Sequence, residues 1–103
     1  MSTLSSMNKP LQLPIKYSEA SPSLRRLARD QYIKQQKGLC AHCGTDLTVA
    51  PEELVKQFPI NKALFPTGMF TYPVHLHHCH TTDLTIGAVH CQCNAILWQY
   101  FNE

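Results

Sequence analysis

Cysteine and histidine side chains carry most of the chemistry available to this chain. Its 103 residues include five Cys and six His. Cys40 and Cys43 form a C-x-x-C pair, and His90 with Cys93 repeats the same spacing further along the chain. Two such pairs close the tetrahedral shell of a structural zinc ion, which leaves no open position for chemistry. The sequence therefore predicts a structural Zn²⁺ site made by these four residues.

Cys91 leaves an alternative open in this ligand set. It stands between His90 and Cys93 in the chain's second pair and could replace either of them. Two ligands in a C-x-C spacing, such as Cys91 and Cys93, fit one tetrahedral ion less well than two ligands three residues apart. His90 and Cys93 are therefore favoured. The odd number of Cys also argues against a closed disulfide framework. Cys79 and Cys91 are then expected to lie outside the zinc site.

A second group consists of His77 and His78, with His80 nearby, and Asn94. An imidazole and a carboxamide oxygen can hold a hydrolytic divalent ion and leave most of its coordination sphere to water and phosphate oxygens. A neighbouring imidazole, with an ordinary pKa of about 6.5, can take a proton from water. The group predicts metal-assisted hydrolysis of a phosphodiester. The competing interpretation is surface His or alternate zinc ligands, and for His75 a plain strand position is favoured.

The charge of the chain is divided unequally between its two parts. Residues 1–37 carry seven Lys and Arg against two acidic residues, a net charge of +5, whereas residues 38–103 carry a net charge of −3. The basic residues that are expected to face a partner are Lys9, Lys16, Arg25, Arg26 and Arg29. They predict contact with the phosphates of DNA without base recognition. The plainer alternative is the solvated face of a helix.

The pattern of apolar residues, and residues that commonly start or end helices and strands, divide the chain into a few elements. Residues 1–20 are expected to form a flexible basic arm, and residues 21–103 a single domain. Ser21-Pro22 is typical of a helix start, which predicts a helix over residues 22–36. Further elements are expected at 51–58 (helix), 74–78 and 84–89 (strands) and 92–101 (helix), with no assignment for 59–73.

These motifs together resemble a known family of nucleases. The matching segments are Cys40-x-x-Cys43, then Val74-His75-Leu76-His77-His78-Cys79-His80, then Gly87-Ala88-Val89-His90-x-x-Cys93-Asn94-Ala95. Their order and spacing are similar to those of the HNH (ββα-metal) endonucleases, above all the phage recombination endonuclease VII group. That group has C-x-x-C, then H-L-D-H-x-H, then R-G-x-x-C-x-x-C-N. The resemblance covers about residues 38–98.

The resemblance implies a small α+β fold, a zinc-stabilised ββα-metal domain with an N-terminal helix. It makes His78 the general base, His77 and Asn94 the ligands of a catalytic Mg²⁺-type ion, and His80 a contact to the phosphate or the metal. His77 replaces an Asp, which favours Mn²⁺, Co²⁺ or Ni²⁺. His90 replaces a zinc Cys. No middle Asn is available to orient His78, so a backbone carbonyl is expected to do so.

The function implied is that of a metal-dependent DNA endonuclease, a phage-type hydrolase in the host cytoplasm, with a homodimer as the implied assembly. The alternative is a non-catalytic zinc module that binds nucleic acid or protein. A zinc deaminase is disfavoured because its H-x-E and P-C-x-x-C motifs are absent. No apolar run approaches the length of a membrane span, and the first residues lack a secretory apolar segment. No contact with membranes is expected, and the protein is expected to be intracellular.

Overall fold

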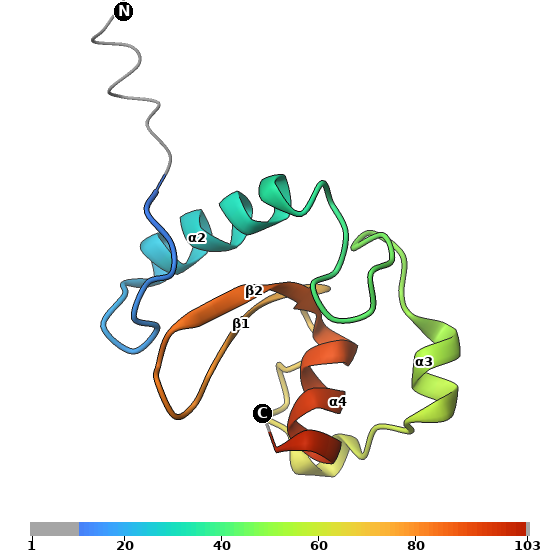
Figure 1. Ribbon diagram of the computed structural model, residues 1–103. Helices are drawn as coiled ribbons and strands as arrows, with labels where there is room; N and C mark the ends of the chain where they lie inside the picture. The colour runs from blue at the N-terminus through green and yellow to red at the C-terminus, as the bar shows by residue number, and fades with distance from the viewer. Residues whose placement is uncertain (1–10, 103) are drawn as a thin grey trace, which may run out of the picture.

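The computed structural model describes residues 11–102 as a small α+β fold with three α-helices and a two-stranded sheet (Figure 1). The elements are α2 (Pro22–Gln35), α3 (Glu52–Gln57), the 3-10 helix η1 (Lys62–Leu64), β1 (Val74–His78), β2 (Thr85–His90) and α4 (Cys91–Phe101). Each expected helix and strand is present, and no end differs from its expected position by more than one residue. The unassigned segment 59–73 contains η1. No helix within residues 11–102 has the length and apolar character that crossing a membrane requires.

Helix α2 begins as the sequence predicts and is attached to the sheet by its inner face. The Ser21 hydroxyl accepts a hydrogen bond from the Leu24 N–H at 3.1 Å, which satisfies one of the free donors of the first turn. Ala28 and Tyr32 are buried. The Tyr32 hydroxyl lies 2.9 Å from Thr85 Oγ1 on β2. The arginines of α2 are thereby held at a fixed distance from the hairpin.

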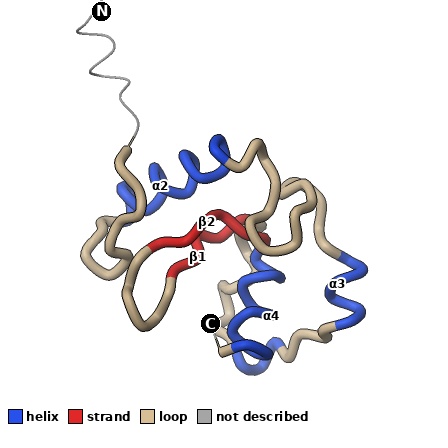
Figure 2. The backbone as a smooth tube through the Cα atoms, in the orientation of Figure 1, coloured by secondary structure: helices blue, strands red, loops and turns tan. Residues whose placement is uncertain are grey.

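Strands β1 and β2 lie side by side (Figure 2), and their antiparallel pairing has one irregularity. The register pairs Val74 with His90 and His77 with Gly87, but the next residue, His78, pairs with Thr85. The extra residue on β2 is therefore Ile86, and a bulge of this kind bends the strands and changes the direction of nearby side chains. The bulge falls between the two histidines that the sequence singles out.

Gly87 allows the end of α2 and the Cys40–Cys43 turn to approach the hairpin closely. The side-chain amide of Gln36 spans this junction: its Oε1 accepts from the Ala88 N–H, and its Nε2 donates to the Ala88 and Leu39 carbonyls, all at 2.7–2.9 Å. A Cβ atom on Gly87 would lie 2.8 Å from Gln36 Oε1 and 3.0 Å from Ala41 Cβ. Any larger residue would force this junction apart.

Residues 15–18, which were expected to belong to a flexible arm, run beside the hairpin turn and are called here the N-terminal strap. Ile15 exchanges two hydrogen bonds of 3.0 Å with Thr85. Tyr17 N–H donates to the Asp83 carbonyl at 2.8 Å, and the Ser18 hydroxyl donates to the Asp83 carboxylate at 2.6 Å. These partners lie far along the sequence, so no local pattern indicated them. Residues 1–10 of the expected arm are outside the described residues.

The core is small and lies between α2, the segment that follows it, β2 and the start of α4. The largest fully buried side chains are Val89, His90, Cys93 and Ile96. Figure 1 shows α2 along one side of the hairpin and α4 on the other side. Two of these four core residues are predicted zinc ligands. The metal site is therefore part of the core and not an attachment to it.

Candidate functional site

The four predicted zinc ligands come together in one cluster. Cys40 and Cys43 come from the turn after α2, His90 ends β2, and Cys93 lies in the first turn of α4. Their ligand atoms all lie within 4.8 Å of one another. Ligands at zinc–sulfur and zinc–nitrogen distances of about 2.0–2.3 Å stand roughly 3.3–3.8 Å apart in a tetrahedron, so small adjustments suffice. The cluster fits a structural metal ion such as zinc.

The orientation of His90 supports this ligand set. Its Nε2–H donates to the Asp46 carbonyl at 2.8 Å, which leaves Nδ1 as the free nitrogen. Nδ1 faces the cluster, at 3.4 Å from Cys43 Sγ and 3.6 Å from Cys93 Sγ. A carbonyl that fixes the outer nitrogen of a ligating imidazole is a common feature of zinc sites. The segment from Cys40 to Asp46, called here the knuckle, therefore supplies two ligands and also the carbonyl that orients a third.

The thiols of the cluster are electrostatically unequal. A hydrogen bond from Cys93 lowers the pKa of Cys40. The same hydrogen bond, together with burial, raises the pKa of Cys93. A bound zinc ion would displace the thiol protons, because thiolates are the ligands. Cys91 is buried outside the cluster, where its thiol donates to Gln92 Oε1, and Cys79 also lies outside it.

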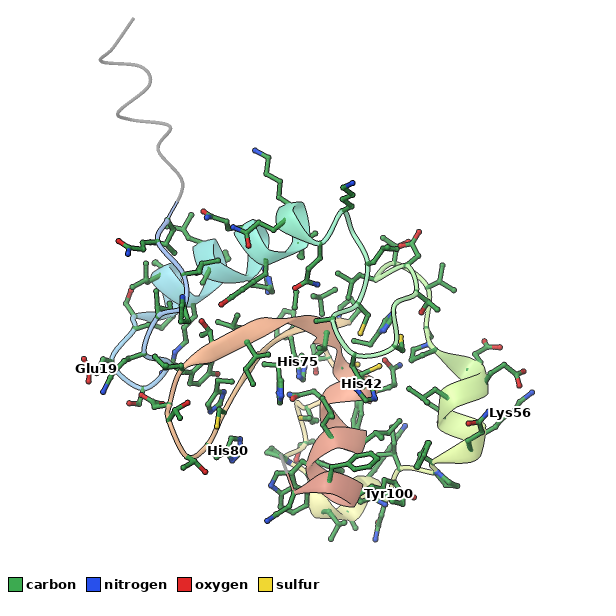
Figure 3. All side chains as sticks on the ribbon, viewed as in Figure 1. Glu19, His42, Lys56, His75, His80 and Tyr100 are labelled. Atoms are coloured by element: carbon green, nitrogen blue, oxygen red, sulfur yellow. The ribbon has the colours of Figure 1, made fainter. Side chains whose placement is uncertain are left out.

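Asn94 joins two histidines of β1 in a second polar group. His77 Nδ1 lies 3.1 Å from Asn94 Oδ1, and Asn94 Nδ2 lies 3.0 Å from His75 Nδ1. Burial lowers the pKa of His75, so its neutral ring can accept from the amide. This second contact fixes the amide with its oxygen toward His77. Figure 3 shows His75 between the hairpin and α4.

His77 and Asn94 are the two residues that the sequence predicts as ligands of a divalent ion, and a hydrogen bond joins them. Because the Asn94 oxygen can only accept, His77 Nδ1–H is the donor in this 3.1 Å contact. Adjacent ligand atoms of an octahedral ion, with bonds of about 2.1 Å, stand about 3.0 Å apart, so an ion bound here would replace that proton with little movement of the two atoms. His77 is only 5 % exposed, so the nitrogen is held in place by its surroundings. The donor set, one nitrogen and one amide oxygen, suits a hydrolytic ion of intermediate hardness.

His78 belongs to a stack of rings and not to a hydrogen-bonded pair. Its imidazole is parallel to the Tyr17 ring, with centroids 3.9 Å apart and planes 7° apart, and His80 stacks on its other side at 4.8 Å. The Arg25 guanidinium covers the outer face of Tyr17 at 4.0 Å. Within residues 11–102, the His78 ring has no hydrogen-bonding partner. In place of the expected backbone carbonyl, His78 contacts Tyr17 of the strap, which Arg25 of α2 covers.

The environment of His78 favours its neutral form. Burial lowers the pKa of this histidine, and the neighbouring His80 acts in the same direction. Asp83 alone among its charged neighbours opposes the shift. A neutral imidazole at neutral pH is the form that can accept a proton.

Residues of α2, the strap, the hairpin and α4 line one cleft of about 610 Å³. Arg25, Arg26 and Arg29 line it from α2, and Tyr17 lines it from the strap. From the opposite side it is lined by His75, His78, His80 and Asn94, and Figure 3 shows His80 beside the turn that joins the strands. All three predicted DNA-contacting arginines and three of the four predicted catalytic-site residues therefore share one opening. His77 lies behind them, in contact with Asn94.

Two residues of this site were missed by the sequence analysis. His75 was interpreted as a plain strand position, although a residue two positions before His77 must share its face of the strand. That spacing was the available signal. Tyr17 gave no signal, because its contact with His78 depends on the strap folding back across the turn.

Comparisons of the chain with protein-family models, with curated proteins and with solved structures found no match. The resemblance to the HNH endonucleases is therefore confined to the residue pattern of the Cys and His motifs.

Proposed function

We propose that this protein is a metal-dependent DNA endonuclease of the HNH (ββα-metal) type, with a structural zinc ion in its core. One observation carries the proposal: a single cleft is lined by arginines on one side and by His78, His80 and Asn94 on the other. A phosphodiester is the substrate group that such a cleft would attract, since it is anionic and is cleaved by a base acting with a cation.

The arginines would position the DNA backbone. Arg25 and Arg29 are partly buried and Arg26 is exposed, and all three face the cleft from one helix. Guanidinium groups bind phosphate oxygens through paired hydrogen bonds, which orient the strand as well as attract it. No base-reading contact is required for this step, so the binding is independent of sequence.

His78 would act as the general base. Its neutral ring lies at the cleft, where it can take a proton from the water that attacks the phosphorus atom. Stacking between Tyr17 and His80 fixes the plane of the ring, and neither ring nitrogen has a hydrogen-bonding partner among residues 11–102. Because the ring plane is fixed, the water that gives up its proton must approach His78 within that plane.

His77 and Asn94 would hold the divalent ion, with His80 available beside them. When bound, such an ion supplies positive charge to the scissile phosphate and its leaving oxygen. His75 orients the Asn94 amide so that its oxygen is the atom presented. Because an imidazole stands in the position that Asp occupies in the resembled family, we propose Mn²⁺ or Ni²⁺ as better activators than Mg²⁺.

Nicking of supercoiled plasmid tests this function. Zinc-loaded protein is assayed with added Mg²⁺, Mn²⁺ or Ni²⁺, and His78→Ala is compared with the parent. Loss of a general base lowers the rate by about 10²–10⁴-fold. The matched control is His42→Ala, which removes an exposed imidazole of the knuckle that does not line the cleft.

The result that supports the proposal is metal-dependent nicking by the parent and by His42→Ala, with loss in His78→Ala at unchanged zinc content. DNA binding without nicking under any of the three ions would instead establish the non-catalytic zinc module.

A further inference from the structure

A second cavity, of about 320 Å³, adjoins the catalytic cleft and differs from it in character. Its walls are mainly apolar and aromatic, and they include Leu64, Phe65, Met69 and Trp98. His80 and Asn94 line both this cavity and the cleft, so the two lie side by side at the proposed catalytic group. Among residues 11–102, no Lys or Arg lines this cavity, whereas three arginines line the cleft. We call it the aromatic pocket.

The aromatic pocket presents a restrained ring to solvent. Trp98 packs against Phe65 in an edge-to-face contact, with centroids 5.4 Å apart, and Phe65 packs in the same manner on Phe70 at 6.0 Å. Despite these contacts Trp98 remains 42 % exposed. Such a ring loses little conformational freedom on binding, which favours stacking with a planar ligand.

The neighbouring cleft indicates which planar ligand this is. On the proposed function, the arginines and the catalytic group hold one phosphodiester of a DNA strand. Each phosphate carries a nucleoside on either side, so the adjoining base must lie beside the cleft, where the aromatic pocket begins. A base that is paired within a duplex cannot leave its stack without an unpairing cost. An unpaired base carries no such cost and presents a π-face to Trp98.

We infer that the aromatic pocket binds the unpaired nucleobase next to the phosphate in the cleft. The inference rests on the proposed nuclease function and deepens it, because it makes single-stranded or locally opened DNA the preferred substrate. The arginine-lined cleft recognises the backbone, and the aromatic pocket recognises the absence of pairing. Recognition by stacking accepts every base, so this preference is for DNA structure and not for sequence.

Trp98 is the only tryptophan of the chain and reports directly on this pocket. Its emission is measured while zinc-loaded protein, without a second divalent ion, is titrated with single-stranded decathymidylate. A decamer of the same phosphates with every base removed serves as the matched ligand, and binding of both is followed by the anisotropy of a dye at the strand end. We expect decathymidylate to quench Trp98 and to bind about 10-fold more tightly than the abasic decamer. Equal affinities, binding of decathymidylate without a change in emission, or no binding of either strand would overturn the inference.

Variants separate the pocket from the rest of the surface. Trp98→Ala should weaken decathymidylate binding about 10-fold and leave duplex binding unchanged, while Trp98→Phe retains most of the affinity. Phe101→Ala, which removes another exposed ring of α4 outside the pocket, is the control. Zinc content confirms that each variant is folded. A loss with Phe101→Ala as large as that with Trp98→Ala would count against the pocket.

The two proposals can fail separately. Base-dependent quenching in a protein that nicks no plasmid would retain the pocket and remove the nuclease. Nicking of plasmid without base-dependent quenching would retain the nuclease and remove the pocket.

Discussion

Cys93 and Asn94 are consecutive residues in the first turn of α4, and they link the zinc cluster to the proposed site of the catalytic ion. Cys93 belongs to the zinc cluster, and Asn94 contacts both His75 and His77. Zinc binding therefore fixes the start of the helix on which the amide is carried. At this scale most of the site was predictable, because C-x-x-C, H-x-x-C and the His-rich run each have a spacing set by coordination chemistry.

Replacing Asn94 by Ala should abolish most of the nicking activity while the zinc ion stays bound. Loss even of groups that only support a metal ligand costs about 10–100-fold, so loss of a ligand should lower the rate by at least about 100-fold. The measurement is the nicking rate in Mn²⁺ together with the zinc content. Gln92→Ala removes a second amide from the same turn and is the control. Loss of zinc along with activity in Asn94→Ala would show that Asn94 is structural.

The elements were predicted better than their contacts. Alternation and capping residues gave α2, both strands and α4, because these signals act over a few residues. The bulge at Ile86, the Gln36 junction and the strap depend on pairs separated by many residues, such as Ile15 with Thr85. The direction of His78 follows from these distant contacts, which explains why its orienting partner could not be predicted.

Tyr17 should control the rate of the reaction through the position of His78. Tyr17→Leu removes the ring that stacks at 3.9 Å, whereas Tyr17→Phe keeps it. We expect a kcat about 10-fold lower for Tyr17→Leu with little change in KM, because misplacing a reacting group by about 1 Å has large effects on rate. Tyr17→Phe should restore the parent rate. Equal losses in both variants would assign the effect to the hydroxyl and contradict the stacking argument.

Gly87→Ala should destabilise the zinc-loaded protein. The added Cβ atom would meet Gln36 Oε1 at 2.8 Å, and three hydrogen bonds hold that amide in place. Overpacking of this kind costs about 1–3 kcal/mol, which urea unfolding followed by circular dichroism can measure. Gly68→Ala is the control, since its nearest neighbour, Thr71 Oγ1, is 3.9 Å away. Equal stability of the two variants would show that the junction is not tightly packed.

The whole molecule separates a basic surface from a metal-binding core. The net charge of +2 is the sum of +5 for residues 1–37 and −3 for residues 38–103. Arg25, Arg26 and Arg29 face the cleft from α2, whereas the zinc cluster and the residues proposed to hold the catalytic ion all lie within residues 38–103. With so few fully buried apolar side chains, a domain of this size needs further stabilisation, which the zinc cluster is placed to give.

Removal of zinc should therefore unfold the protein. Zinc binding contributes on the order of 10 kcal/mol in small zinc modules, which is comparable to the whole stability of a typical domain. Chelation should remove the helical circular dichroism signal, and adding back zinc should restore it. A spectrum that is unchanged after verified loss of the metal would show that the apolar core suffices.

The proposed nuclease function predicts that plasmid nicking depends on a second metal ion, in addition to zinc. Protein carrying one equivalent of zinc is assayed with and without added Mn²⁺, at constant zinc content. The account predicts no nicking by the zinc-loaded protein alone, and nicking that rises with Mn²⁺ to a plateau and is absent from His78→Ala. Nicking that needs no second ion, or none in Mn²⁺, Mg²⁺ or Ni²⁺, would contradict it.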